Sequence, residues 1–243
     1  MAPLMNKLLV ITGASRGIGK ATAAMFAANG YDVINISRSA LELPDQLEVS
    51  VSNLAIDLSN FNWSNEQGDA LKDLIVEPRK IVLVHNAALH YSDSLQTVAA
   101  DEFQQSLQVN VVAPTQLNQL LMPLMTSGSS VLYLGSTLSE KAVPGACSYV
   151  TSKHAVVGLM RATCQDTAGS GIHTACVCPG FTDTEMLRGH IGNDQAVVDE
   201  ITSNVAFGRL IETEEIATTL YFCANNAVIN GTILHANLGQ IER

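Results

Sequence analysis

The chain has 243 residues, of which 47% are hydrophobic and 15% are charged, which excludes a disulfide-stapled miniprotein and an intrinsically disordered chain. It carries 13 Lys and Arg residues against 23 Asp and Glu residues, a net charge of −10. Such an acidic surface repels phosphate backbones and anionic lipid, so we expect no nucleic-acid or membrane partner. A ligand that bears phosphate would need a local basic site.

No apolar run reaches the roughly 18 residues that a membrane helix requires. Residues 1–7 lead directly into a strand-like run without a secretory leader, so we expect a cytoplasmic protein. The cysteines are odd in number and lack Cys-x-x-Cys spacing, which favours reduced thiols and no metal site. They are Cys147, Cys164, Cys176, Cys178 and Cys223.

Short runs of aliphatic and β-branched residues recur along the chain without polar alternation, a pattern typical of strands buried on both faces of a parallel sheet. These runs are residues 8–11, 33–36, 54–56, 81–84, 131–134, 173–178 and 232–234. Helical patterns lie between them at about 17–29, 66–76, 97–125, 148–168 and 213–224. The alternation predicts the α/β class, with a single Rossmann-type domain over residues 1–243: a doubly wound parallel sheet with helices on both faces.

Two stretches lack a strand signal. Residues 59–68 are polar, contain Trp63 and predict a surface loop. Residues 182–206 are the longest part of the chain without a sheet pattern, and we expect them to form a substrate lid. Ligands of doubly wound sheets bind at the carboxyl ends of the strands, so we expect the site along that edge.

The first predicted strand is followed by TGASRGIG at residues 12–19 and then by a helical pattern. Gly13 permits the tight turn, Gly17 removes a Cβ that would hold the backbone off a pyrophosphate, and Gly19 lets the helix pack close to the sheet. Free N–H groups at a helix N-terminus attract phosphate. We therefore predict a dinucleotide cofactor bound by Gly13, Ser15, Arg16, Gly17, Ile18 and Gly19.

The second predicted strand ends in Ser37 and Arg38, where an acidic residue would favour a free ribose 2′-hydroxyl. With Arg16, these residues suit a 2′-phosphate, so we predict NADP(H) rather than NAD(H). The alternative is that both arginines are only solvated. Asp57, beside Leu58 after the third strand, is predicted to bind the adenine amino group; the alternative is a turn cap.

Ser136 follows the fifth predicted strand, and Tyr149 and Lys153 lie four residues apart in a helical pattern. That spacing places the phenol and the ammonium on one helix face. A cation about 4 Å away, at an effective dielectric of about 20, stabilises a phenolate by about 4 kcal/mol. Tyr149 is thus predicted to exchange a proton without a metal, while Ser136 hydrogen-bonds a substrate carbonyl oxygen.

These motifs resemble the short-chain dehydrogenase/reductase family over nearly the whole chain. The resemblance rests on residues 12–19, Asp57, HNAA at 85–88, Asn110, Ser136, Tyr149, Lys153, Pro179-Gly180 and Thr184. It implies that Ser136, Tyr149 and Lys153 are the catalytic set. It also implies that Asn110 is a fourth member, holding a water that links Lys153 to solvent.

The resemblance further implies cofactor contacts around the nicotinamide half, including a bond from Lys153 to its ribose. The residues concerned are Asn86, Ala87, Tyr149, Lys153, Pro179, Gly180, Thr182 and Thr184. The family usually has Asn-Asn-Ala-Gly where this chain has His85 to Ala88. We expect His85 and His154 to be structural rather than catalytic, because Tyr149 already fills the acid role.

The predicted function is NADP(H)-dependent interconversion of a small carbonyl compound and its alcohol. The substrate wall is expected to be of mixed polarity, which favours a modestly polar carbonyl compound. It is predicted to include Leu89, His90, Tyr91, Leu138, Ser139, Pro144, Cys147, Phe181, Met186 and Leu187.

Two alternative functions stay open. A 3-oxoacyl-acyl-carrier-protein reductase needs basic residues to dock its acidic carrier, and in those enzymes arginines precede the fifth and sixth strands. Here residues 126–130 and 168–171 contain no cation, which disfavours carrier docking. A non-catalytic NADP(H) sensor typically lacks the tyrosine or the lysine, whereas Tyr149 and Lys153 are both present.

The resemblance also implies a homodimer or homotetramer, in which the helices near 97–125 and 148–168 pack across a two-fold axis. The second helix carries Ala155, Gly158 and Ala162, which permit close approach. The alternative is that these small residues face the chain's own sheet.

Overall fold

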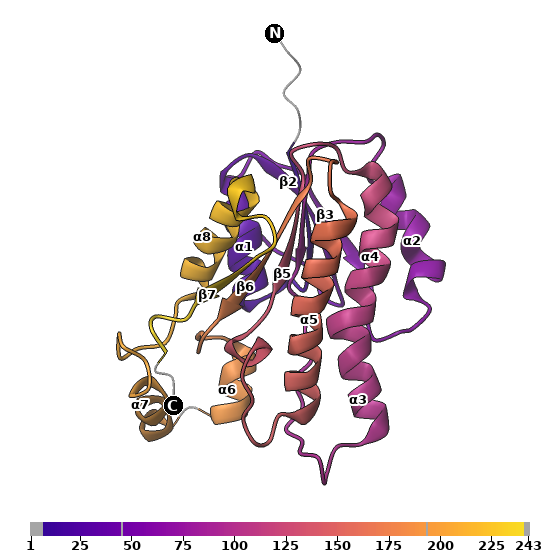
Figure 1. Ribbon diagram of the computed structural model, residues 1–243. Helices are drawn as coiled ribbons and strands as arrows, with labels where there is room; N and C mark the ends of the chain where they lie inside the picture. The colour runs from indigo at the N-terminus through magenta and orange to yellow at the C-terminus, as the bar shows by residue number, and fades with distance from the viewer. Residues whose placement is uncertain (1–6, 45, 193, 241–243) are drawn as a thin grey trace.

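The computed structural model describes residues 7–44, 46–192 and 194–240. Its strands form one seven-stranded parallel sheet in the order β3-β2-β1-β4-β5-β6-β7, which confirms the predicted doubly wound α/β fold (Figure 1). The strand order reverses between β1 and β4, and such a switch point opens a crevice at the carboxyl ends. Residues 1–6, on which the expectation about a leader falls, lie outside the described residues.

The strands follow the predicted runs closely. They are β1 (Lys7–Thr12), β2 (Tyr31–Ser37), β3 (Val51–Ala55), β4 (Ile81–His85), β5 (Ser130–Leu134), β6 (His173–Pro179) and β7 (Thr232–Ala236). β4, β5 and β6 are buried along their whole length, which is why their sequences read as continuous apolar runs. β3 pairs with β2 alone and is partly exposed, so it tolerates Ser52 and Asn53 and its apolar signal is weak.

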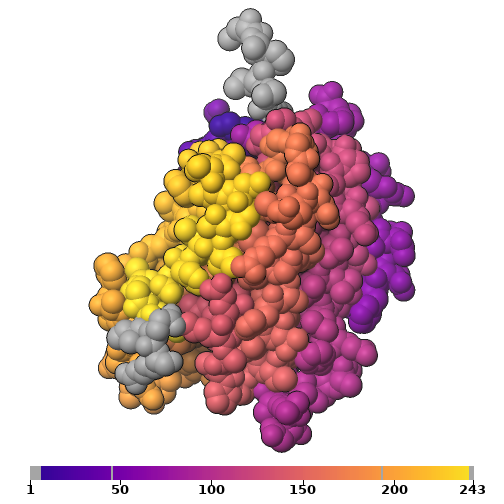
Figure 2. All heavy atoms as spheres, viewed as in Figure 1, coloured from indigo at the N-terminus to yellow at the C-terminus, as the bar shows by residue number. Residues whose placement is uncertain are grey.

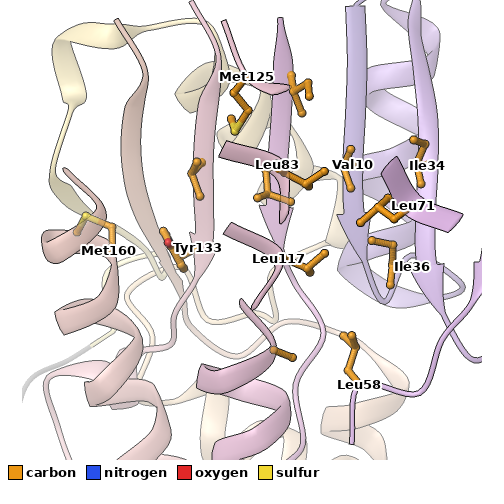
Figure 3. Close-up of a cluster of buried hydrophobic side chains, with 14 of the residues drawn as sticks. Val10, Ile34, Ile36, Leu58, Leu71, Leu83, Leu117, Met125, Tyr133 and Met160 are labelled. Carbon is orange, nitrogen blue, oxygen red and sulfur yellow. The ribbon is translucent and has the colours of Figure 1, made fainter. Parts of the chain in front are cut away.

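The helices cover both faces of the sheet (Figure 1). They are α1 (Gly17–Ala28), α2 (Trp63–Asp73), α3 (Ala100–Leu107), α4 (Ala113–Leu121), α5 (Cys147–Asp166), α6 (Glu185–Ile191), α7 (Gln195–Thr202) and α8 (Thr213–Ala224). α1 and α8 pack on one face, and α2, α4 and α5 pack on the other. Figure 3 shows the hydrophobic core between the sheet and α2, α4 and α5, where strand side chains meet Leu71, Leu117 and Met160 of these helices.

The segment predicted as one helix at 97–125 is divided by a π-helical turn, Gln108–Val112, between α3 and α4. Pro114 explains the division: it has no N–H to donate to the carbonyl of residue 110, its partner in α-helical register. The ladder widens instead, and the N–H of Ala113 donates to the carbonyl of Gln108. Asn110 lies within this turn.

The prediction of a surface loop at 59–68 is wrong for its second half, because α2 begins at Trp63. The indole is fully buried in the core. The asparagines that suggested a loop form the turn before the helix: the N–H of Asn62 donates to Oδ1 of Asn60 at 2.9 Å. Nδ2 of Asn60 then donates to Glu66 in the first turn of α2, at 2.8 Å.

The predicted lid, residues 182–206, contains the two short helices α6 and α7. Both of its ends are attached to the body of the protein by single β-bridges, one between Thr182 and Ile211 and one between Val205 and Gln240. The lid therefore spans the sheet edge as a strap between two fixed points.

Candidate active site

A cavity of about 940 Å³ opens at the carboxyl edge of the sheet. Every residue that the sequence predicted to bind the cofactor or to act in catalysis lines this cavity, with the exception of Asn110. The topology explains the convergence, because the segments after β1, β2, β3, β4, β5 and β6 all begin at this edge.

The turn after β1 depends on its glycines. Gly13 (φ +69°) and Gly17 (φ +54°) lie in the left-handed region that other side chains disfavour. α1 starts at Gly17, and no side chain caps its N-terminus, so the N–H groups of its first turn are available to a ligand. Because this turn lines the cavity, it can hold a phosphate group there.

Asn86 fixes the turn from the β4 side. Its Nδ2 donates to the carbonyl oxygens of Thr12 (2.9 Å) and Gly13 (3.0 Å). In return, Oγ1 of Thr12 accepts the backbone N–H groups of Asn86 (3.0 Å) and Ala87 (2.9 Å). These four hydrogen bonds hold the end of β1 against the end of β4 at the cavity.

Asn35 of β2, which the sequence reasoning missed, fixes the turn from the other side. The side chain is fully buried, and its Oδ1 accepts the N–H of Ala14 at 3.1 Å. Its Nδ2 donates to Oδ1 of Asn53 (2.8 Å) and Oγ of Ser37 (3.1 Å), which orients the end of β2. A lone amide inside an apolar strand was the available signal, since buried polar groups need partners.

Arg16 and Arg38 line the part of the cavity formed by the turn after β1 and the ends of β2 and β3. We call this part the nucleotide end, after the cofactor that the sequence predicts there. Both arginines are exposed, and neither forms an ion pair within the part of the chain that the structure describes.

Asp57 also lines this end, but its Oδ1 accepts hydrogen bonds from the N–H (3.0 Å) and the hydroxyl (2.8 Å) of Ser59. The Ser59 N–H bond lowers the pKa of Asp57, with smaller contributions from the Ser59 hydroxyl and Arg38 and an opposing one from burial. Asp57 is therefore a turn cap that also faces the cavity.

Ser136, Tyr149 and Lys153 come together in the cavity as the sequence predicted. Lys153 is 3% exposed, and its Nζ donates to the carbonyl of Leu134 at 2.7 Å. The same Nζ lies 5.4 Å from the centroid of the Tyr149 ring. A buried ammonium that donates to a neutral carbonyl stabilises negative charge that develops beside it.

Asn110 holds two segments together behind this group. It is 3% exposed; its Oδ1 accepts the N–H of Leu89 at 2.8 Å, and its Nδ2 donates to the carbonyl of Leu89 (3.0 Å) and to Oγ of Ser152 (2.8 Å). No hydrogen bond joins it to Lys153 among the described residues. Because the side chain is committed, a water held by Asn110 would have to bind its backbone.

We call the part of the cavity between Tyr149 and α6 the substrate end, after the sequence prediction. Most of the predicted wall is there, but Ser139 and Cys147 do not line it. Ser139 is 2% exposed because its Oγ accepts the N–H of Ser136 at 3.1 Å. Cys147 starts α5, and Gly145 and Ala146 line the cavity in its place.

Two imidazoles lie near Tyr149 at this end. The ring of His90 stacks on that of Tyr149 with centroids 4.3 Å apart, and His190 of α6 lies on the far side of His90 at 4.0 Å. Burial lowers the pKa of His90 to about 4, helped by His190 and Lys153 and opposed by Asp93. The sequence reasoning did not single out His190.

His85 is structural, as expected. It is buried outside the cavity, and its Nε2 lies 2.9 Å from Oδ1 of Asn118. Burial lowers its pKa to about 4, so the ring is neutral at physiological pH. His154 is exposed on α5, where its Nδ1 lies 2.9 Å from the carbonyl of Val150.

All five cysteines are free. In residues 7–44, 46–192 and 194–240, no three His, Cys, Asp or Glu side chains are grouped so that they could hold a metal ion. Within the same ranges, we find no helix with the length and apolar character needed to cross a bilayer.

A family model described as Enoyl-(Acyl carrier protein) reductase matches residues 13–240. The chain belongs to the short-chain dehydrogenase/reductase family. It is accordingly an oxidoreductase that acts on an alcohol or carbonyl group, and a nicotinamide dinucleotide is the cofactor typical of its family.

Several relatives match along their whole length. The chain is 28% identical to 3-oxoacyl-[acyl-carrier-protein] reductase FabG of Salmonella typhimurium, covering 97% of each protein. It is 29% identical to meso-2,3-butanediol dehydrogenase of Serratia marcescens, over 93% of this chain and 91% of that protein. The solved structure of ElxO with NADP bound superimposes with a TM-score of 0.85 at 27% identity, over 97% of this chain and 99% of that one.

Proposed function

We propose that this protein is an NADP(H)-dependent oxidoreductase that interconverts a small carbonyl compound and its alcohol by hydride transfer. One observation carries the proposal: Ser136, Tyr149 and the buried Lys153 meet in the same cavity as the glycine turn. That cavity also contains two exposed arginines that form no ion pair within the described chain.

The nucleotide end of the cavity fits a phosphorylated dinucleotide. The uncapped N-terminus of α1 suits the pyrophosphate, and Arg16 and Arg38, with Ser37, suit a 2′-phosphate. The bound cofactor supplies the hydride in reduction and accepts it in oxidation. The residues that would flank its adenine and nicotinamide parts are Asp57, Leu58, Asn86, Ala87, Pro179, Gly180, Thr182 and Thr184.

Tyr149 is the proposed general acid and base. In reduction its phenol donates a proton to the carbonyl oxygen, and in oxidation the phenolate removes that proton from the alcohol. The buried ammonium of Lys153 stabilises the phenolate. Asn110 is proposed to supply protons to Lys153 through a water bound at its backbone, since its side chain is occupied.

Ser136 is proposed to stabilise the oxyanion. Its Oγ already accepts the N–H of Leu138 at 3.1 Å, so its own hydroxyl hydrogen is left to point at a substrate oxygen. A fixed donor of this kind binds the developing alkoxide more strongly than the ground-state carbonyl, which lowers the barrier to hydride transfer.

The test is consumption of NADPH and of NADH with a panel of aldehydes and ketones, and the reverse reaction with their alcohols. We expect turnover with at least one carbonyl compound and at least about a tenfold preference for NADPH, equivalent to ~1.4 kcal/mol. Tight NADPH binding without any turnover would identify a nucleotide sensor instead and would overturn the proposal.

A second candidate, reduction of a 3-oxoacyl group on acyl carrier protein, is favoured by the names of relatives at 28% identity. The sequence argument against it needs correction. Residues 126–130 and 168–171 precede β5 and β6, so they lie at the amino edge of the sheet, away from the cavity. Their lack of cations does not bear on docking beside this cavity.

A different observation disfavours the carrier. The lysines and arginines that line the cavity are Arg16 and Arg38 at the nucleotide end and Lys153, which is buried. In residues 7–44, 46–192 and 194–240, the substrate end therefore lacks an exposed lysine or arginine for an acidic carrier. Comparing acetoacetyl-CoA with the same acyl group on carrier protein decides the matter: a large gain in kcat/KM from the carrier would favour the second candidate.

We also propose a homo-oligomer that uses the outer face of α5. Gly158 and Ala162 are exposed there and Ala155 is half-buried, so for the first two the alternative of facing the chain's own sheet is wrong. Figure 2 shows the outer surfaces of α5 and of the α3–α4 segment as one broad face with no other segment over it. Light scattering after gel filtration tests the assembly, and a Gly158→Arg variant should weaken it.

A further inference from the structure

Three aromatic rings form a column across the substrate end of the cavity. Tyr149 comes from α5, His90 from the segment after β4, and His190 from α6 of the lid. The centroids are 4.3 Å apart from Tyr149 to His90 and 4.0 Å apart from His90 to His190. All three side chains line the cavity, so the imidazoles adjoin the phenol that we assign to proton transfer.

The imidazoles have spare hydrogen-bonding capacity. Neither nitrogen of His90 is hydrogen-bonded to a residue in the described part of the chain. His190 has one weak contact, from its Nδ1 to Oγ of Ser92 at 3.5 Å. A polar group of a ligand at the edges of the two rings would therefore gain donors without breaking strong bonds.

The charged residues that line the cavity favour an anion at the substrate end. The acidic residues that line the cavity are Asp57, after β3, and Glu185, beside Gly17, and both lie toward the nucleotide end. Among the residues that the structure describes, no carboxylate lines the substrate end, although the protein as a whole is strongly acidic. Its groups that can become positive are His90, His190 and the buried Lys153.

We propose that His90 and His190 bind a carboxylate on the substrate, so that the protein acts on a short oxo acid and the matching hydroxy acid. This inference rests on the function proposed above and adds the substrate class. Two ring N–H groups on adjacent imidazoles match the two oxygens of a carboxylate. The rest of the wall is largely apolar and suits a short aliphatic chain: Leu138, Val143, Met186, Leu187 and Ile191.

Binding of the anion is coupled to proton uptake. In the free protein, burial and the nearby His190 and Lys153 keep His90 neutral, while Asp93 opposes them. Oδ1 of Asp93 accepts the N–H of Ser148 near the N-terminus of α5, at 3.0 Å, and its buried Oδ2 has no hydrogen-bond partner in the described chain. A carboxylate beside the rings adds a second negative charge to that of Asp93, so the acid should bind more tightly as pH falls from 8 to 6.

The experiment compares oxo acids with their methyl esters, which share the reacting ketone but lack the charge. Acetoacetate, pyruvate and levulinate are each paired with the ester, with NADPH in excess. We expect at least one acid to exceed its ester at least tenfold in kcat/KM at pH 6.5, with the gap narrowing toward pH 8. Esters equal to or better than every acid at both pH values would overturn the inference.

Variants locate the effect. His190→Asn and His90→Asn should each lower the acid-to-ester ratio at least tenfold, whereas His154→Asn, an exposed change on the same helix as Tyr149, should leave the ratio as it is. An acid preference that survives both cavity variants would show that another group binds the anion.

A binding measurement separates this inference from the proposed function. Histidine labelled with ¹⁵N reports protonation of each ring by NMR in the NADPH complex. Malonate should increase protonation at His90 or His190, and dimethyl malonate should not. If malonate leaves both rings unchanged, the carboxylate site is refuted even for an active enzyme; if it protonates them while no carbonyl compound is reduced, the site stands and the proposed reaction fails.

Discussion

Gly19 packs against Gly13 so closely that a methyl group on Gly19 would overlap the carbonyl oxygen of Gly13 and the amide of Asn86. The carbonyl oxygen belongs to the backbone, and the amide is held by hydrogen bonds to the backbone, so neither has much freedom to move. The same amide links Thr12 to Gly13 through 2.9 Å and 3.0 Å hydrogen bonds. The third glycine of the motif therefore serves the packing of the turn itself, besides the helix–sheet contact that the sequence suggested.

Gly19→Ala should consequently lower the free energy of unfolding by roughly 1–3 kcal/mol, as overpacking does, and weaken NADPH binding. Urea unfolding and isothermal titration measure the two effects. Gly189→Ala is the matched control, because nothing lies within 4 Å of its added methyl group and the site is exposed within α6. The control should stabilise the protein by roughly 0.5–1 kcal/mol. A Gly19→Ala protein as stable as the control would contradict the packing argument.

Tyr149→Phe should reduce kcat by about 10²–10⁴, the range that general acid catalysis contributes, while NADPH binding stays within a fewfold of wild type. The phenylalanine keeps the ring that stacks on His90 and loses the exchangeable proton. Stopped-flow oxidation of NADPH and fluorescence titration give the two numbers. Tyr221→Phe, the same change at a tyrosine of α8 that does not line the cavity, serves as control, and undiminished turnover in Tyr149→Phe would remove the phenol from the mechanism.

Arg38→Asp should move cofactor preference toward NADH by at least tenfold, about 1.4 kcal/mol. The guanidinium is exposed and forms no ion pair in the described chain, although it interacts electrostatically with Asp57, so its loss costs the fold little. The new carboxylate repels a 2′-phosphate. Lys72→Asp on α2 makes the same charge change away from the cavity. The ratio of kcat/KM for NADPH and NADH is the readout, and an unchanged ratio would leave Arg38 without this role.

His85 should make the protein sensitive to acid. Its pKa is about 4 in the folded protein and near the ordinary 6.5 when unfolded, so the unfolded chain binds more protons between these values. The stabilising contribution is present above pH 6.5 and is lost as pH falls toward 4, in total about 3 kcal/mol. His85→Asn should flatten this part of the urea-derived stability profile, and His154→Asn should not; an equally steep profile in His85→Asn would show that other groups cause the loss.

The fold and the meeting of Ser136, Tyr149 and Lys153 in one cavity were predictable because they depend on local sequence patterns. The spacing of Tyr149 and Lys153 fixes their shared helix face whatever the rest of the chain does, and Ser136 follows from its place after a buried strand. The carboxyl edge of a parallel sheet then brings such segments together. For the same reason the glycine turn was placed correctly.

The features that the sequence did not predict depend on contacts between distant segments. Trp63 looked like part of a polar loop because its burial requires α2 to fold onto the sheet. His190 meets His90 only through the path of the lid, 100 residues further along the chain. The partners of Asn110 likewise depend on a π turn that Pro114 imposes, a local cause whose effect on Leu89 and Ser152 is not local.

The two β-bridges at the ends of residues 182–206 limit how the cavity can open. Thr182 is tied to Ile211 and Val205 to Gln240, so backbone pairing holds both ends of this segment to the body of the protein, while α6 between them presents Met186, Leu187 and His190 to the cavity. One short helix thus contributes several of the side chains that we propose to contact the substrate. Replacing α6 alone would then be expected to exchange one substrate repertoire for another without rebuilding the rest of the enzyme.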